Sequence, residues 1–152
     1  MPLMKSRIPL LIIEGRLVLT TALVCKKLRL HVPFHEFVID TGSNFSFLSY
    51  KDVLQLQIPM KNRRSMGRIQ FGGSDFDKTE LPPINLLMLK ENKTDHINIK
   101  VILGALLTKK TSERKRKIAE TLPSILGMDF LSINNFSLHI YPHEKIAYLS
   151  QE

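Results

Sequence analysis

The sequence is poor in cysteine and has no long apolar run. Cys25 is the only cysteine, which excludes an internal disulfide and a zinc site made of several cysteines. Residues 8–13 and 17–24 are apolar, but Glu14 and Arg16 separate them, and neither stretch reaches the about 20 residues that cross a bilayer. We therefore predict no membrane span and a soluble, cytoplasmic protein. A signal peptide with a short apolar segment stays open, although the two charges argue against it.

The size and composition indicate one domain built mainly from strands. The chain has 152 residues, 43% hydrophobic and 24% charged, which is enough for one ordinary core and short for two. Eight prolines and seven glycines, with β-branched and aromatic residues spread throughout, suit many short strands rather than a helical bundle. We therefore predict a single all-β domain over residues 1–152. The net charge of +8 favours solubility and weak attraction to acidic surfaces but says little about the fold.

Alternating apolar residues and turn signals predict a series of short strands and two short helices. Glu14-Gly15 predicts the first turn, Gly72-Gly73 predicts a hairpin, and Pro33 is expected to end the third strand. Ser49 is a candidate N-cap for a short helix. The expected strands are residues 7–13, 16–23, 28–32, 67–71, 76–81, 84–89, 97–103, 136–141 and 145–149, and the expected helices are 49–55 and 128–133.

An apolar run, residues 37–39, ends abruptly in Asp40, Thr41, Gly42 and Ser43. Three apolar residues in a row are typical of a strand buried on both faces, and the glycine permits a tight backbone turn. An ionised carboxylate at the edge of a core needs hydrogen bonds, which the two hydroxyls and the N–H groups of the turn can supply. Asp40 is therefore a candidate catalytic acid. The competing interpretation is an ordinary turn after a strand.

Three motifs stand in a fixed order along the chain. The first is Asp40-Thr41-Gly42-Ser43, the second is Phe71-Gly72-Gly73, and the third is Ile125-Leu126-Gly127-Met128-Asp129. Their order and spacing resemble the retropepsin-like aspartic proteases, single-lobed relatives of the retroviral proteases, over about residues 23–149. The resemblance implies a closed or curled, barrel-like sheet with a flap hairpin and one or two short helices.

The resemblance also implies a role for each motif. Asp40 is expected to be the catalytic aspartate, Thr41 to lock the two active-site loops together across a dimer, and Gly42 and Ser43 to line the catalytic turn. The tip of a substrate-binding flap is expected at Phe71, Gly72 and Gly73. The segment that packs beneath the catalytic loop is expected at Ile125, Leu126 and Gly127, with Asp129 in a structural role on the following helix.

The chemistry of such a site requires two carboxylates. One activates a water as a base while the other, protonated, polarises the peptide carbonyl, because two acids held close together share one proton. The sequence has one Asp-Thr-Gly and no second Asp-Thr-Gly or Asp-Ser-Gly. A twofold homodimer solves this, since an isologous interface places two copies of Asp40 face to face. By the resemblance, residues 145–149 and the N-terminal strands are candidates for an intersubunit sheet.

The sequence departs from the family at four positions. Retroviral members carry acidic residues just beyond the catalytic turn, where this chain has Asn44 and Phe45. They carry an arginine directly after the Leu-Gly pair of the third motif, where this chain has Met128, so the acid–arginine interaction is absent. Gln70 stands where many members have another glycine before the flap tip, which implies a stiffer or differently shaped flap.

The segment 92–121 is longer and more charged than a compact retroviral enzyme needs, and residues 108–121 within it form the predicted basic loop. Its basic part, Lys109 to Lys117, attracts phosphate at low salt but has no interleaved aromatic residues for base stacking. We therefore predict a solvated loop, with self-cleavage there as a further possibility, and no specific nucleic-acid partner.

Two histidine pairs have the helical spacing of metal ligands. His31 and His35 are four residues apart, and so are His139 and His143. A proline lies between the members of each pair, which makes a helix improbable, so we predict no metal site. We expect no cofactor.

These observations favour an aspartic endopeptidase that uses a water held between two copies of Asp40 to cleave a polypeptide substrate. The alternative is a catalytically weak or inactive relative that serves as a dimerisation or peptide-binding module. A basic domain associated with nucleic acid is the third hypothesis.

Overall fold

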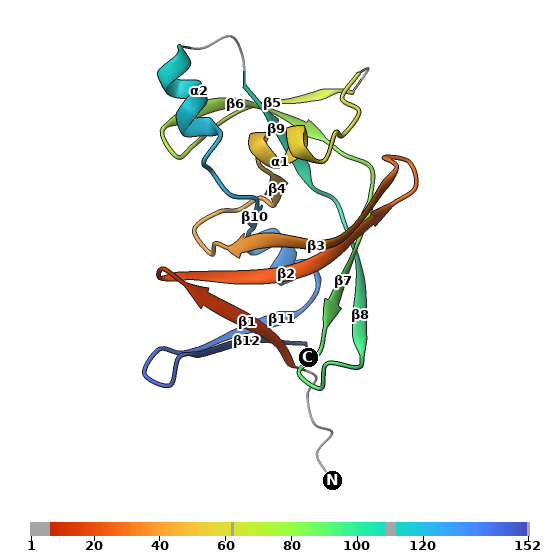
Figure 1. Cartoon of the computed structure of the whole chain (residues 1–152), viewed down its shortest axis with the longest axis vertical. Coiled ribbons are helices and arrows are strands. Elements are labelled where there is room, and N and C mark those ends of the chain that lie inside the picture. The colour runs from red at the N-terminus through yellow and green to blue at the C-terminus, as the bar shows by residue number, and fades with distance from the viewer. Residues whose placement is uncertain (1–6, 62, 109–111, 152) are drawn as a thin grey trace.

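The computed structural model describes residues 7–61, 63–108 and 112–151 (Figure 1). These residues form twelve strands and three short helices. The strands are β1 (Arg7–Ile13), β2 (Arg16–Cys25), β3 (Leu30–Ile39), β4 (Phe47–Leu48), β5 (Ser65–Phe71), β6 (Ser74–Glu80), β7 (Ile84–Leu89), β8 (His96–Val101), β9 (Gly104–Leu107), β10 (Ile125–Leu126), β11 (Phe136–Tyr141) and β12 (Ile146–Gln151). The helices are α1 (Tyr50–Gln55), α2 (Glu113–Ala119) and α3 (Met128–Ile133). The prediction of a mainly β protein is confirmed.

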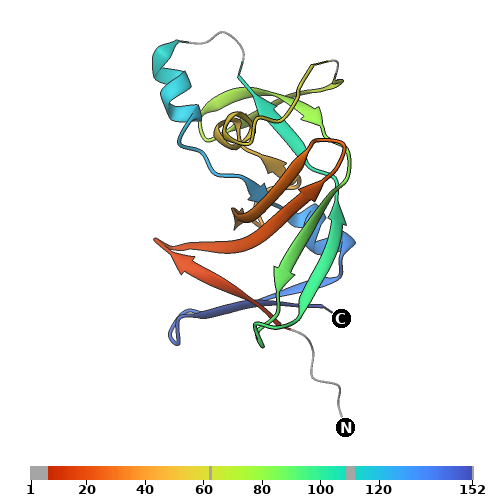
Figure 2. The same ribbon diagram turned by 45° about the vertical axis from the view of Figure 1, so that its right-hand side comes forward.

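The strand order is open. It runs β11-β12-β1-β2-β3-β10-β4-β9-β6-β5, with β7 and β8 branching from β2, so the closed-barrel part of the prediction is not confirmed. β1 joins two sheets, because its first half pairs with β12 and its second half pairs with β2. Figures 1 and 2 show the β5–β6 hairpin and α2 at one end of the molecule and the β11–β12 hairpin at the other.

The third strand does not end at Pro33. β3 continues to Ile39, and its pairing with β2 shifts between Thr21 and Leu23, so that two residues of β3 lie opposite one of β2. A proline cannot donate to a strand ladder, but a bulge leaves a residue unpaired and therefore tolerates it. The expectation that proline stops the strand is wrong for this reason.

The basic segment is not simply a loop. Residues 113–119 form α2, with the Ser112 hydroxyl accepting from the Lys115 N–H at the N-terminus. Lys117 and Glu113 lie 3.8 Å apart at the i,i+4 spacing that supports a helix. The prediction of a solvated loop is therefore wrong for these residues, although all of them except Ala119 are exposed or nearly so. Residues 109–111 lie outside the described part.

β12 has no free edge for an intersubunit sheet. Its residues pair with β1 on one side and with β11 on the other, all within one chain. The expectation that residues 145–149 join a sheet across a dimer is therefore not supported. The outer edge of this part of the sheet belongs to β11.

The core has two parts. The larger cluster includes Leu23, Phe37, Leu86 and Leu126, all fully buried. Cys25 also belongs to it, and its thiol donates to the Pro83 carbonyl. The smaller cluster contains Phe47, Phe76, Leu106, Ala119 and Ile125 and lies between the β5–β6 hairpin, α2 and the end of β3. It joins the predicted flap to the predicted catalytic region.

We expect Leu86→Ala to destabilise the protein because Leu86 is 0% exposed in the centre of β7. Loss of its buried methyl groups and the cavity they leave should lower the free energy of unfolding by about 2–5 kcal/mol. Leu89→Ala, on the same strand but 43% exposed, is the control and should cost well under half as much. Chemical denaturation at one protein concentration measures both, and equal losses would contradict the assignment of β7 to the core.

Candidate active site

Asp40 lies immediately after β3, where its side chain is only partly buried. Its backbone N–H donates to the carbonyl of Leu126 at 3.0 Å, and its own carbonyl accepts from the Ser43 N–H at 3.1 Å. One carboxylate oxygen, Oδ1, accepts from the Gly42 N–H at 2.9 Å. The turn therefore holds one oxygen by a backbone donor, as expected for an acid whose orientation is fixed.

β10 lies next to the end of β3 and contacts the Asp40 turn. Its residues Ile125 and Leu126 pair in parallel with Val38 and Ile39 of β3. Only parallel pairing lets two strand ends emerge side by side, so the loop after β10 follows the same direction as the Asp40 turn. The third motif and the first motif are thus brought into direct contact.

Gly127 occupies a position with no room for a side chain. A Cβ placed there would lie 2.5 Å from the carbonyl oxygen of Ser43 and 2.7 Å from that of Phe45. The following residue, Met128, donates its N–H to the Ser43 carbonyl at 2.8 Å. The glycine therefore allows the two loops to approach backbone to backbone.

Ser46 and Asp129 lock the two loops together. The Ser46 hydroxyl donates to Asp129 Oδ1 at 2.6 Å and accepts from the Gly127 N–H at 2.9 Å. The Ser46 N–H donates to Asp129 Oδ2 at 3.2 Å, and the Phe130 N–H donates to Asp129 Oδ1 at 2.8 Å. Ser46 is not a residue that we singled out from the sequence. The signal that could have found it is its lone hydroxyl within the apolar run from Phe45 to Leu48, which needs a buried partner.

Thr41 and Ser43 lie at the surface of the turn. Thr41 is exposed in the single chain, and its predicted contact across a dimer stays a prediction. The Ser43 hydroxyl donates to the Phe45 carbonyl at 2.7 Å. The expectation that this hydroxyl tunes the Asp40 carboxylate is therefore not what the structure shows; it stabilises the turn instead.

Phe71, Gly72 and Gly73 lie at the tip of the β5–β6 hairpin. Both glycines have positive φ, +58° and +81°, which a two-residue hairpin turn of this kind requires. The Phe71 ring contacts the Phe47 ring edge to face at 4.9 Å between centroids. Leu122 packs so close to Gly72 that a Cβ there would clash with it. The hairpin tip is thus packed over the small cluster that also contains Ile125.

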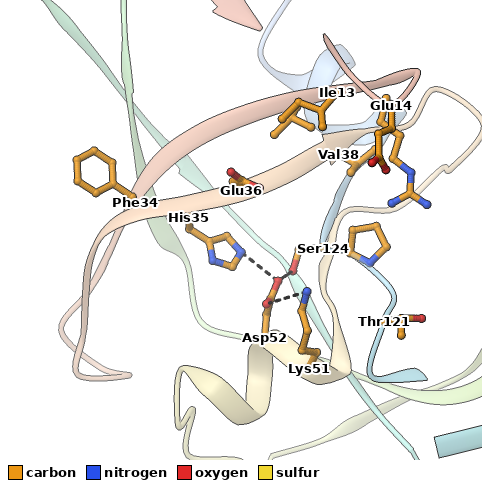
Figure 3. A pocket seen from close by; sticks show the side chains of 13 residues that line it. Ile13, Glu14, Phe34, His35, Glu36, Val38, Lys51, Asp52, Thr121 and Ser124 are labelled. Carbon is orange, nitrogen blue, oxygen red and sulfur yellow. Dashed lines mark hydrogen bonds and ion pairs between the residues drawn. The ribbon is translucent and has the colours of Figure 1, made fainter. Parts of the chain in front are cut away.

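A second polar cluster, formed by side chains from β3, α1 and the segment before β10, lies in a cavity of about 390 Å³ (Figure 3). The Ser124 hydroxyl donates to Asp52 Oδ2 at 2.5 Å, and His35 Nε2 lies 3.4 Å from the same oxygen. All three side chains are buried. The sequence analysis considered His35 only as a metal ligand, which it rejected, and it did not predict the contact of His35 with Asp52.

The electrostatics of this cluster depend on burial. Desolvation lowers the pKa of His35 below its ordinary value of 6.5, although the nearby Asp52 opposes the change. Lys51 acts in the same direction as burial, and Glu36 acts against it. His35 is therefore largely neutral near pH 7.

Two further findings concern only the described residues. No helix among residues 7–61, 63–108 and 112–151 is long and apolar enough to cross a membrane. In the same part of the chain no three or more His, Cys, Asp or Glu side chains gather in a way that would hold a metal ion. His31 and His35 lie on a strand, and His139 donates to or accepts from the Ser150 hydroxyl at 2.8 Å.

Comparison with known proteins shows the fold. The chain resembles the crystal structure of a retropepsin-like aspartic protease from Rickettsia conorii, with a TM-score of 0.59 and 12% sequence identity. The match covers 95% of this chain and 90% of that one. No protein-family model matches the sequence, and no curated protein matches it. The retropepsin-like fold is therefore supported by structure.

We expect Ser46→Ala to lower the free energy of unfolding by about 1–3 kcal/mol, because the Gly127 N–H and the Asp129 carboxylate each lose a buried partner. Ser43→Ala, in the same loop, removes a more exposed hydroxyl and should cost about 1 kcal/mol or less. Denaturant titration compares the two. A Ser46 variant as stable as the Ser43 variant would show that the two loops do not depend on this link.

The burial of His35 predicts a pH dependence of stability. Unfolded, His35 takes up a proton near its ordinary pKa; folded, it does so only at lower pH, so the unfolded state binds more protons between the two values. This contribution is complete above about pH 6.5 and is lost as the pH falls. The melting temperature of wild type should therefore drop more between about pH 7.5 and 5 than that of His35→Gln. The control is His31→Gln, an exposed histidine on β3, which should follow wild type; parallel curves for all three would contradict the prediction.

Proposed function

We propose that the protein is an aspartic endopeptidase whose active site forms between two chains. The observation that carries the proposal is the position of Asp40, at the end of a buried strand, with one oxygen held by the Gly42 N–H. The likeness to a retropepsin-like aspartic protease supports it at the level of the fold.

The chain supplies one acid of this type, so the site needs a second copy. Asp40 of each subunit would face the other across a twofold axis and share one proton, and a water between them would attack the peptide carbonyl. Thr41, Phe45 and Met128 are exposed around the turn in the single chain. A second chain would cover these side chains, which is the burial that an isologous interface requires.

The substrate would be a polypeptide in extended form. The hairpin tip at Phe71, Gly72 and Gly73 would lie over it as the flap, and main-chain hydrogen bonds would give part of the affinity. In the single chain this tip packs on Phe47 and near Leu122, so substrate entry requires the tip to rise from the small cluster.

Asp40→Asn should abolish peptide cleavage and leave the chain folded, because the amide cannot act as a base. Wild type, Asp40→Asn and the control Asp95→Asn, an exposed residue of the β7–β8 turn, are compared on a peptide library. Activity per chain should also rise with protein concentration as dimers form. Cleavage by Asp40→Asn at the wild-type rate would refute the proposal.

The inactive relative remains the second candidate, favoured by Asn44, Phe45 and Met128, which replace the acid–arginine pair of the family. A pepstatin-type inhibitor separates the two. Stoichiometric inhibition of cleavage supports the enzyme, whereas peptide binding with no turnover supports a binding module.

A further inference from the structure

Asp52 joins two segments that are far apart in the sequence. Its carboxylate, at the start of α1, accepts from the Ser124 hydroxyl, and the same oxygen lies 3.4 Å from His35 on β3 (Figure 3). The Ser124 hydroxyl in turn accepts from the Ser49 N–H at 2.9 Å, and the Ser49 hydroxyl accepts from the Asp52 N–H at 3.2 Å. These contacts form a closed network of buried polar groups.

Both segments that Asp52 joins lead directly to the Asp40 turn. Ser124 precedes β10, and its carbonyl accepts from the Val38 N–H at 2.9 Å. Two residues further along, the Leu126 carbonyl accepts from the Asp40 N–H. His35 belongs to β3, the strand that ends at Asp40. The network therefore links β3, which ends at the Asp40 turn, to the segment just before β10, the strand that pairs with β3 next to that turn.

A buried carboxylate is an expensive way to hold two strands together. Asp52 is 8% exposed, and an apolar side chain there would avoid the desolvation cost of the charge. The hydrogen bonds among Ser49, Asp52 and Ser124 are directional and give a more defined geometry than apolar contact. Among the described residues His35 Nε2 has no hydrogen-bond partner and contributes only its 3.4 Å contact with Asp52. Such a device is useful where a small displacement matters, as at a catalytic group.

We propose that Asp52 is a positioning residue for Asp40: through its hydrogen bond to Ser124 and its 3.4 Å contact with His35, it sets the spacing between β3 and β10 on which the Asp40 turn rests. This inference rests on the proposed function. His35, Asp52 and Ser124 lie outside the three motifs, and by this proposal they contribute to the same reaction.

The charged groups around the network set its response to pH. His35 faces Asp52 and Lys51 from α1 and has Glu36 beside it on β3, while Glu14 and Arg16 line the same cavity from the β1–β2 turn. Protonation of His35 would turn its 3.4 Å contact with Asp52 into an ion pair. The negative charge of Asp52 supports that protonation, so its removal should lower the pKa of His35 further.

The test compares Asp52→Asn with Asp95→Asn, which removes the same charge from an exposed turn. Asp52→Asn should reduce kcat by about tenfold or more while KM stays within about threefold, since the acid is displaced but the substrate surface is intact. Amide hydrogen exchange should become faster in residues 38–46 and 124–129 and stay unchanged in 84–101. The imidazole of His35, followed by NMR, should titrate at lower pH than in wild type.

The outcomes separate this inference from the proposed function. A kcat and exchange pattern equal to that of Asp95→Asn, or faster exchange throughout the chain, would overturn the positioning role. If wild type cleaves no peptide, the proposed function fails, and local exchange together with the His35 titration still decides whether Asp52 fixes the Asp40 turn. Ser124→Ala, which keeps the charge, replaces Asp52→Asn if that variant does not fold and should give the same kinetic and exchange results. If neither variant folds, the network is a folding requirement and the proposal is wrong.

Discussion

The parallel pairing of β3 with β10 is the constraint on which the candidate site depends. Two backbone hydrogen bonds, from Val38 to Ser124 and from Asp40 to Leu126, place the loop of each strand end against the other. Gly127 allows the two loops to lie backbone to backbone because it has no side chain. The hydrogen bond between Ser46 and Asp129 holds the loops together. An acid at the end of an isolated strand would sample many orientations, whereas this one is held from two directions.

The same constraint explains how the loops hold together without the acid–arginine pair of retroviral members. In this chain the polar link lies inside, where the Ser46 hydroxyl and the Asp129 carboxylate share three hydrogen bonds with backbone N–H groups in addition to the bond between them. The outer positions, Phe45 and Met128, are apolar and exposed. Exposed apolar side chains around the Asp40 turn favour burial against another surface through the hydrophobic effect rather than through ion pairs.

Local patterns predicted most of the fold because hairpins depend on neighbouring residues. The apolar run in residues 84–89, the alternation in residues 136–141 and the Gly72-Gly73 turn predicted the correct strands. The prediction that β3 ends at Pro33 was wrong because the bulge depends on the pairing of β3 with β2, and the local sequence does not reveal that pairing. Residues 113–119 were predicted as a loop because of their high charge. The N-cap Ser112 and the i,i+4 spacing of Glu113 and Lys117 are the signals of the helix that forms there.

The sequence predicted the residues of the three motifs but not the contacts between distant segments around them. Asp40 and Gly127 carry local signatures, but Ser46 meets Asp129 across 83 residues and Asp52 meets Ser124 across 72. Such contacts are decided by topology, and a serine or a helix-start aspartate has an ordinary local explanation. Position in the fold therefore matters more than residue type for Asp52. At a helix start in solvent it would be an ordinary first-turn acid, whereas here its carboxylate accepts from Ser124, just before β10, and lies 3.4 Å from His35 on β3. A polar residue buried at such a junction constrains geometry more than it adds stability, because its desolvation cost offsets much of its hydrogen-bond energy.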